Sequence, residues 1–156
     1  MHIKVVYATE TGNSEDLAKD TVRCLNNSGF ETGKPINLGT VDLGLFDDAD
    51  VLLAIVSTWG DGEPPSEAES FHHSLTSSAP LGLGHLRFAV LALGDTGYDL
   101  FCQYGKDLDA ELERHGAIRL HDRTDCDIDF DDYFTAWVAA ILGCLSSLRE
   151  QRSCAA

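Results

Sequence analysis

The sequence predicts an α/β fold, a doubly wound parallel sheet with helices on both faces. Strand-like and helix-like segments alternate along the chain without a linker or an internal repeat. Two segments, 50–57 and 87–93, are nearly continuous apolar runs, as expected for central parallel strands that are covered on both faces. Helical periodicity lies between the strands, and right-handed crossovers would place those helices on both faces of the sheet.

The expected strands of the first half are an apolar N-terminal run at 2–8, a weaker segment around 30–38 and the central run at 50–57. The weaker segment contains Gly33 and Pro35, which favours a position at the sheet edge. Apolar residues at helical spacing predict helices over 13–28 and near 67–78.

The second half adds a long amphipathic helix at about 99–115, with Gly116 as its expected C-terminal cap. A short strand near 117–121 follows. The last helix carries an apolar stripe that includes Trp137, and we assign this side chain to the core rather than to a cofactor contact. Five strands are therefore expected in the sheet.

Length and charge limit the functional classes. The 156 residues are expected to form one domain over 1–150 and a C-terminal tail at 151–156. The chain has 11 basic and 26 acidic residues and a net charge of −15. Such a protein repels nucleic acid and anionic membranes and attracts basic partner surfaces. Solubility alone is the alternative explanation of the charge.

The cysteines and histidines show no metal or disulfide pattern. The five cysteines are odd in number and form no C-x-x-C, which argues against a disulfide scaffold, a dithiol site or a zinc ribbon. The six histidines have no H-x-x-x-H or H-x-x-E-H spacing. There is no apolar signal segment and no apolar run near the ~20 residues of a membrane span. We expect a cytoplasmic monomer without a metal site.

The segment Thr9-Glu10-Thr11-Gly12-Asn13-Ser14 joins the first strand to the first helix. A strand, a hydroxyl-rich turn and a helix together present free backbone N–H groups and a positive helix end to an anion. The turn lacks the Gly-Lys-Ser/Thr of a Walker loop and the three spaced glycines of a Rossmann loop. The segment therefore predicts a neutral cradle for one phosphate monoester, with an ordinary N-capped helix as the alternative.

Two further loops follow the central strands. These are Ser57-Thr58-Trp59-Gly60-Asp61-Gly62-Glu63-Pro64-Pro65 and Leu93-Gly94-Asp95-Thr96-Gly97-Tyr98-Asp99-Leu100-Phe101-Cys102. Because the carboxyl ends of parallel strands meet at one rim, we expect all three loops to lie together. Core packing does not explain Trp59 and Tyr98 on glycine-rich loops, so they are candidates to sandwich a flat ring system. A phosphate cradle beside an aromatic clamp indicates flavin mononucleotide (FMN).

The three motifs together resemble the FMN-binding loops of the flavodoxin family. The segment from Phe101 to Asp109 is similar to the corresponding part of the sulfite reductase flavoprotein and other diflavin reductases. The resemblance implies a flavodoxin-like five-stranded sheet of order 2-1-3-4-5. The chain ends after the last helix, so we expect a stand-alone member of the short-chain or MioC-like kind.

The resemblance also implies residue roles. Trp59 would cover the inner face of the ring and Tyr98 the outer face, while Asp95 and Cys102 would meet the pyrimidine edge through main-chain atoms. The family usually has Ser, Thr or a bulkier residue at the position of Gly97, and a glycine there would loosen the loop that aims Tyr98. The expected cofactor-binding residues are Thr9, Glu10, Thr11, Gly12, Asn13, Ser14, Ser57, Thr58, Trp59, Gly60, Asp61, Gly62, Leu93, Gly94, Asp95, Tyr98, Phe101 and Cys102.

The implied function is a one-electron carrier, with no catalytic residues of its own, between an NADPH-dependent reductase and an acceptor enzyme. Acidic residues on the loops would disfavour the anionic, fully reduced flavin. The expected partners are basic-faced redox proteins, with a flavodoxin or ferredoxin NADP⁺ reductase as donor. One alternative is a flavin enzyme that reduces quinones or nitro compounds directly. A phosphorelay receiver domain is another, but the required acidic pair and lysine are missing.

Overall fold

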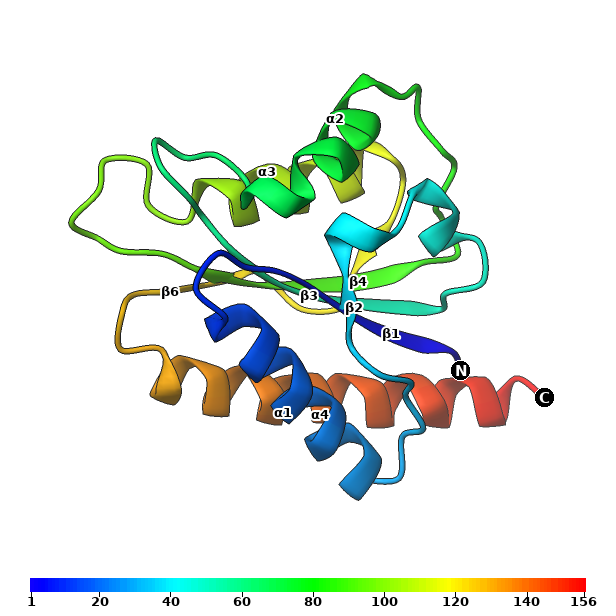
Figure 1. The fold of residues 1–156 in the computed structure, drawn as a ribbon. Coiled ribbons are helices and arrows are strands. Elements are labelled where there is room, and N and C mark those ends of the chain that lie inside the picture. Colours follow the sequence, from blue (N-terminus) through cyan, green and yellow to red (C-terminus); the bar gives the residue numbers. More distant parts are fainter.

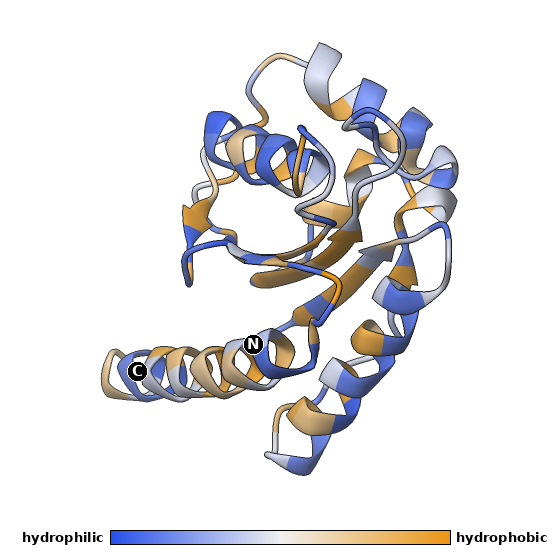
Figure 2. Ribbon diagram, turned by 90° about the vertical axis from the view of Figure 1, so that its left-hand side faces the viewer, coloured by the Kyte–Doolittle hydropathy of each residue, from blue (hydrophilic) through white to orange (hydrophobic).

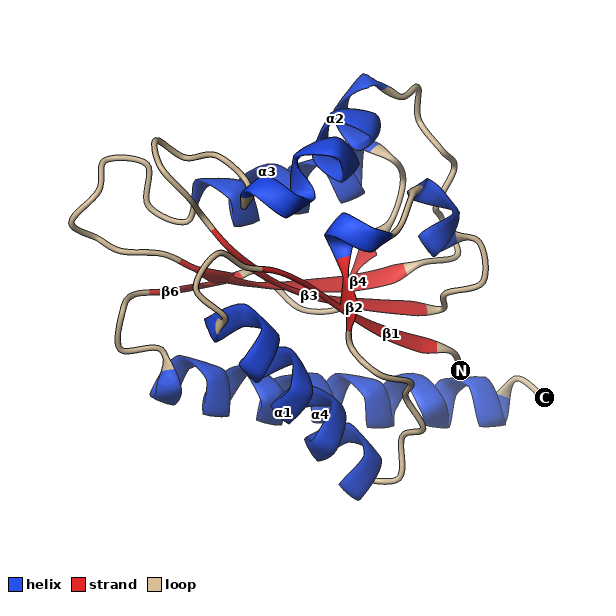
Figure 3. Cartoon of the chain, viewed as in Figure 1, coloured by secondary structure: helices blue, strands red, loops and turns tan.

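The computed structural model of the chain describes residues 1–156. A parallel sheet forms the middle layer, with helices above and below it (Figures 1 and 3). Its three long strands are β1 (Ile3–Ala8), β3 (Val51–Ser57) and β4 (Arg87–Leu93). Both flanking strands pair along their full length, with β1 against β3 and β3 against β4. The α/β layered prediction is confirmed.

The strand order is β2-β1-β3-β4-β5, as expected, and β6 adds a further pairing to β4. The expected strand around 30–38 is reduced to β2 (Ile36–Asn37) at the sheet edge, where Pro35 precedes it. The expected strand at 117–121 is confirmed as β5 (Ile118–Arg119), which pairs with the start of β4. A further strand that was not expected, β6 (Thr124–Cys126), pairs with the end of β4.

Two helices cover each face of the sheet. In Figure 1, α1 (Asn13–Asn27) and α4 (Asp131–Cys154) lie on one side, and α2 (Glu69–Ser77) and α3 (Gln103–Arg114) on the other. Short 3₁₀ turns complete the connections: η1 (Leu38–Thr40), η2 (Leu43–Phe46) and η3 (Ser66–Ala68). No helix has both the length and the apolar composition needed to cross a membrane.

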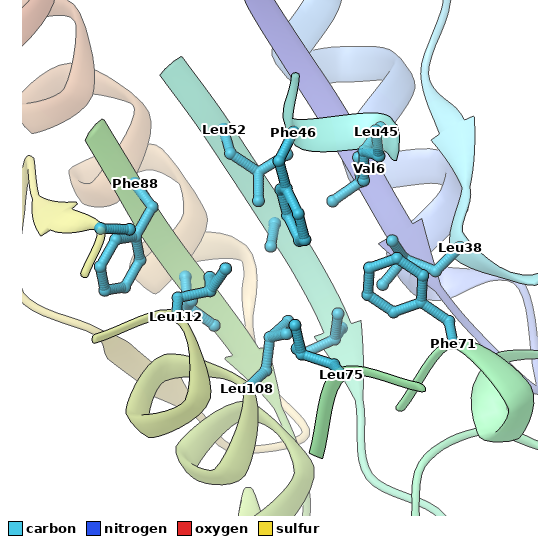
Figure 4. Close-up of a cluster of buried hydrophobic side chains, with 14 of the residues drawn as sticks. Val6, Leu38, Leu45, Phe46, Leu52, Phe71, Leu75, Phe88, Leu108 and Leu112 are labelled. Carbon is cyan, nitrogen blue, oxygen red and sulfur yellow. The ribbon is translucent and has the colours of Figure 1, made fainter. Parts of the chain in front are cut away.

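The central strands are hydrophobic along most of their length (Figure 2). Their residues are buried on both faces of the sheet, which explains the unbroken hydrophobic sequences. Alternate residues of β3 contribute to the two cores on opposite sides. Figure 4 shows the core beneath α2 and α3, built by Val6, Leu38, Leu45, Phe46, Leu52, Phe71, Leu75, Phe88, Leu108 and Leu112. Trp137 is buried in the opposite core under α1 and α4, so its assignment to the core is confirmed.

Two helix boundaries differ from the expectation. α3 begins at Gln103 rather than near residue 99, because Cys102 adopts left-handed backbone angles, φ +54°, that a helix cannot include. α4 continues to Cys154, past the expected start of the tail at 151. An ion pair of 3.0 Å between Arg152 Nη2 and Asp50 Oδ1 holds this last turn against the start of β3.

Candidate functional site

The carboxyl ends of β1, β3, β4 and β6 point to the same edge of the sheet, on the left in Figure 1. A cavity of about 530 Å³ opens between the loops that follow them. This volume is within the range of sites for small organic ligands, about 300–1,000 Å³. The position is also where open parallel sheets bind ligands.

Most of the residues expected to bind a cofactor line this cavity. They are Glu10, Thr11, Asn13, Ser57, Thr58, Trp59, Gly60, Leu93, Gly94, Asp95, Tyr98 and Cys102. The others do not line it: Thr9, Gly12, Ser14, Asp61, Gly62 and Phe101. Three lining residues were missed by the sequence reasoning, namely Leu100, Ile128 and Phe130.

The β1–α1 loop forms the hydroxyl-rich end of the cavity. Gly12 has φ +96° and donates its N–H to Thr9 Oγ1 at 2.9 Å, which closes a tight turn. No side chain caps α1, so the N–H groups of its first turn have no side-chain acceptor. Thr11 and Asn13 line the cavity at this end. An uncapped helix start beside neutral polar side chains fits a phosphate group.

Ser14 has a supporting position behind that loop. Its side chain is fully buried, and its Oγ lies 2.6 Å from Ser57 Oγ at the end of β3. This hydrogen bond joins the first loop to the second. Ser14 therefore supports the loop from behind, and its expected contact with phosphate stays a prediction.

Two carboxylates tie the same loop to the η3 turn. Glu10 accepts a hydrogen bond of 2.5 Å from the Ser66 N–H, and Glu67 Oε1 accepts one of 3.3 Å from the Thr9 N–H. The hydrogen bonds from Ser66 lower the pKa of Glu10, so its carboxylate is ionised at neutral pH. An anion in this position cannot bind phosphate through its side chain. Glu10 orients the loop instead.

The β3–η3 loop presents Trp59. Reciprocal hydrogen bonds of 2.8 Å join the backbones of Trp59 and Glu63 into a narrow hairpin. Gly60 and Gly62, with φ +50° and +92°, allow the reversal. Trp59 borders the cavity and is 50% exposed. It therefore offers an apolar surface that the protein itself does not cover.

The β4–α3 loop presents Tyr98, which is 65% exposed. Asp95 organises the turn before it, since its Oδ1 accepts from the Gly97 N–H at 2.7 Å and its carbonyl accepts from the Tyr98 N–H at 3.1 Å. A Cβ at Gly97 would lie 2.9 Å from Asp95 Oδ1. The glycine therefore leaves room for the Asp95 carboxylate, and the expectation that it loosens the loop that aims Tyr98 stays a prediction.

The inner wall is formed where Gly94 approaches Cys102. A Cβ at Gly94 would lie 2.8 Å from Cys102 Sγ and 2.8 Å from its backbone nitrogen, so no larger residue fits. Burial raises the pKa of the Cys102 thiol to about 12, and the thiol donates to the Ala92 carbonyl at 3.4 Å. A neutral, hydrogen-bonded thiol is a poor nucleophile, so Cys102 shapes the wall rather than acting as a redox group.

Ile128 and Phe130 reach the cavity through β6. Ile128 is 66% exposed in the midst of acidic residues, a setting unusual for so apolar a side chain. An isoleucine among acidic residues was the one sequence signal that residues 127–130 border the cavity. Its meaning became clear only from β6, which brings these residues to the end of β4.

Comparisons with known proteins agree with this geometry. The flavodoxin family model matches residues 5–137. The sulfite reductase [NADPH] flavoprotein alpha-component of Bacillus subtilis is 40% identical over 147 residues, which cover 90% of this chain and 23% of that protein. The chain spans about a quarter of the length of the flavoproteins of this kind that it matches.

Two solved structures share the fold over nearly their whole length. The flavodoxin of Streptococcus pneumoniae TIGR4 is 28% identical, with a TM-score of 0.79 over 97% of this chain and 99% of that chain. Oxidised Flavodoxin 2 from Bacillus cereus is 26% identical, with a TM-score of 0.77 over 90% and 97% of the two chains. Sequence, strand order and the cavity at the carboxyl edge of the sheet thus agree, and the chain belongs to the flavodoxin family.

Proposed function

We propose that the chain binds one FMN molecule in this cavity and carries single electrons between redox proteins. The observation that carries the proposal is the arrangement of the cavity, which has an uncapped helix start at one end and two exposed aromatic side chains on separate loops. Such a cavity suits a molecule with a phosphate tail and a flat ring. When bound, FMN supplies reversible one-electron chemistry that the side chains of this protein lack.

The chain's own residues bind and orient the cofactor. The first N–H groups of α1 and the hydroxyl of Thr11 hold the phosphate, and the positive helix end stabilises its charge. Trp59 and Tyr98 cover the ring and exclude water from it. Backbone groups near Gly94 and Cys102 contact the polar edge of the ring. A direct quinone or nitro reductase would need an uncovered ring face for its substrate, so two bordering aromatics favour the carrier.

Binding of FMN and of riboflavin, followed by quenching of flavin fluorescence, tests the cofactor proposal. A hydrogen bond to a charged group contributes about 1.5–3 kcal/mol, so riboflavin, which lacks the phosphate, should bind at least about tenfold more weakly. Replacing Tyr98 by Ala should weaken FMN binding. Tyr133→Ala is the matched control, because Tyr133 is also an exposed aromatic but does not line the cavity. Equal affinity for the two flavins would contradict the phosphate site.

We infer basic-faced redox partners from the charge around the cavity. The loops that border it contain no lysine or arginine, and they carry the carboxylates Asp61, Glu63, Asp95, Asp99, Asp127 and Asp129. Opposite charges give fast and reversible docking, which a shuttle needs, whereas a large apolar interface would separate slowly.

The rate of reduction by an NADPH-dependent reductase should therefore fall steeply as ionic strength rises. Reversing Asp61 and Asp99 together to Lys should flatten that dependence. Reversing Glu31 and Glu150, exposed residues on other parts of the surface, should change it much less. Single reversals are too weak to test the idea, because exposed pairs contribute about 0–1 kcal/mol each. A rate that does not respond to salt would rule out electrostatic docking.

A further inference from the structure

The pairing of β6 with β4 places Asp127 beside the β4–α3 loop that carries Tyr98, called the Tyr98 loop below. β6 ends at Cys126, which lies in register with Leu93 at the end of β4. The Cys126 carbonyl accepts a hydrogen bond of 2.9 Å from the Gly94 N–H, just where the Tyr98 loop leaves the sheet. Asp127 is the next residue, so its side chain is within reach of this loop.

The Asp127 carboxylate accepts three hydrogen bonds. Its Oδ1 accepts from the Thr96 N–H at 3.1 Å and from the Ile128 N–H at 2.9 Å, and its Oδ2 accepts from Thr96 Oγ1 at 2.7 Å. One side chain thereby joins the backbone of two loops that border the cavity from different strands.

The Tyr98 ring depends on its backbone for its position. Because the side chain is 65% exposed, packing within the protein does not fix it. The turn that ends at Tyr98 begins at Asp95, and Thr96 lies within this turn. Any movement of Thr96 therefore changes the direction in which Tyr98 leaves the loop.

We propose that Asp127 is a positioning residue that holds Tyr98 over the cofactor cavity through its hydrogen bonds to Thr96. The role is geometric, and it rests on the proposed binding of FMN. It differs from a role in partner docking, for which only the negative charge would count.

The ionisation of Asp127 agrees with this role. Hydrogen bonds from Thr96 lower the pKa of Asp127, so the carboxylate stays an acceptor at neutral pH. An asparagine would keep one acceptor oxygen for the two N–H groups, and the Thr96 hydroxyl could reverse its role to accept from the amide. The variants Asp127→Asn and Asp127→Ala thus separate geometry from charge.

The test is a double-mutant cycle on FMN affinity. Asp127→Ala should weaken FMN binding by about five- to tenfold, less than the loss of a hydrogen bond made directly to the cofactor, because Asp127 acts through the loop. Asp127→Asn should weaken it by less than about twofold. In the Tyr98→Ala background, Asp127→Ala should have little further effect. Asp122→Ala, an exposed aspartate between β5 and β6, is the control and should leave the affinity unchanged.

A second readout needs no cofactor. In the FMN-free protein, the Thr96 amide should exchange its hydrogen faster in Asp127→Ala than in the wild type, while amides of β3 keep their protection and so report an intact fold. The proposal is wrong if Asp127→Ala binds FMN as the wild type does, if Asp127→Asn is as damaging as Asp127→Ala, or if the loss persists without Tyr98. A wild type that fails to bind FMN would instead defeat the proposed function itself.

Discussion

The contact between α3 and β4 allows a sharp test of the packing beneath the site. Gly105 lies in α3, and a Cβ built there would be 2.2 Å from the Ala92 Cβ and 3.2 Å from its Cα. Carbon atoms in contact prefer about 3.5–4.0 Å, so Gly105→Ala would push the helix away from the sheet by roughly 1 Å. The neighbouring Tyr104 is fully buried, which leaves α3 little freedom to move.

Two effects of opposite sign determine how much Gly105→Ala changes the free energy of unfolding. Replacing a glycine by alanine within a helix stabilises it by about 1 kcal/mol. Overpacking a tight core costs about 1–3 kcal/mol, and this contact involves a strand's backbone atom and Cβ rather than a flexible side-chain end, so the upper part of that range applies. We therefore expect Gly105→Ala to lower the free energy of unfolding by about 2 kcal/mol.

The assay is urea unfolding, with a matched substitution as control. Gly143 lies inside α4, where an added Cβ would meet nothing within 4 Å, so Gly143→Ala should stabilise the protein by about 0.5–1 kcal/mol. Adding Ala92→Gly to Gly105→Ala removes the colliding methyl group and should recover part of the loss. The reasoning is refuted if Gly105→Ala is as stable as the wild type, or if Ala92→Gly gives no recovery in its background.

Three further predictions concern charge, thiols and the phosphate loop. A hydrogen bond from Arg152 lowers the pKa of Asp50 in the folded protein. The ionised Asp50 therefore stabilises the fold fully above its ordinary pKa of 3.8, and this stabilisation is lost as the pH falls through the lowered pKa. The thermal midpoint should fall less steeply between pH 6 and 3 in Asp50→Asn than in the wild type. Iodoacetamide at pH 8 should modify the exposed Cys154 and spare the buried Cys102, as mass spectrometry would show, until the protein is unfolded. Ser57→Ala leaves the buried Ser14 hydroxyl, behind the β1–α1 loop, without its hydrogen-bond partner. In parallel titrations, this substitution should weaken FMN binding more than riboflavin binding.

The central strands and the binding loops could be predicted because their causes are local. β3 and β4 are covered on both faces, and only long apolar runs meet that requirement. Glycines, hydroxyls and exposed aromatics mark the loops in the sequence itself. Trp59 and Tyr98 could thus be assigned to the rim of a cavity before the fold was known.

Of the last two strands, β5 was expected near 117–121, but β6 was not, and the short length of both has a cause that is distant in sequence. β5 has two residues and β6 has three, too few to show a periodicity, and both exist because β4 offers them a free edge. Cys102 is a similar case. Nothing in its residue type predicts left-handed backbone angles, which are set by its close approach to Gly94.

These distant causes also change how the acidic charge is interpreted. From composition, every aspartate near the cavity counts as surface charge for a basic partner. In the structure, Asp95 and Asp127 accept hydrogen bonds from loop amides, whereas Asp61 and Asp99 are exposed and bond to no loop amide. The two pairs should respond differently to neutral replacement. Asparagine at Asp61 and Asp99 should alter the salt dependence of electron transfer and spare FMN affinity, because charge is their whole contribution. Alanine at Asp127 should alter FMN affinity even at high salt, because hydrogen-bond geometry is not screened.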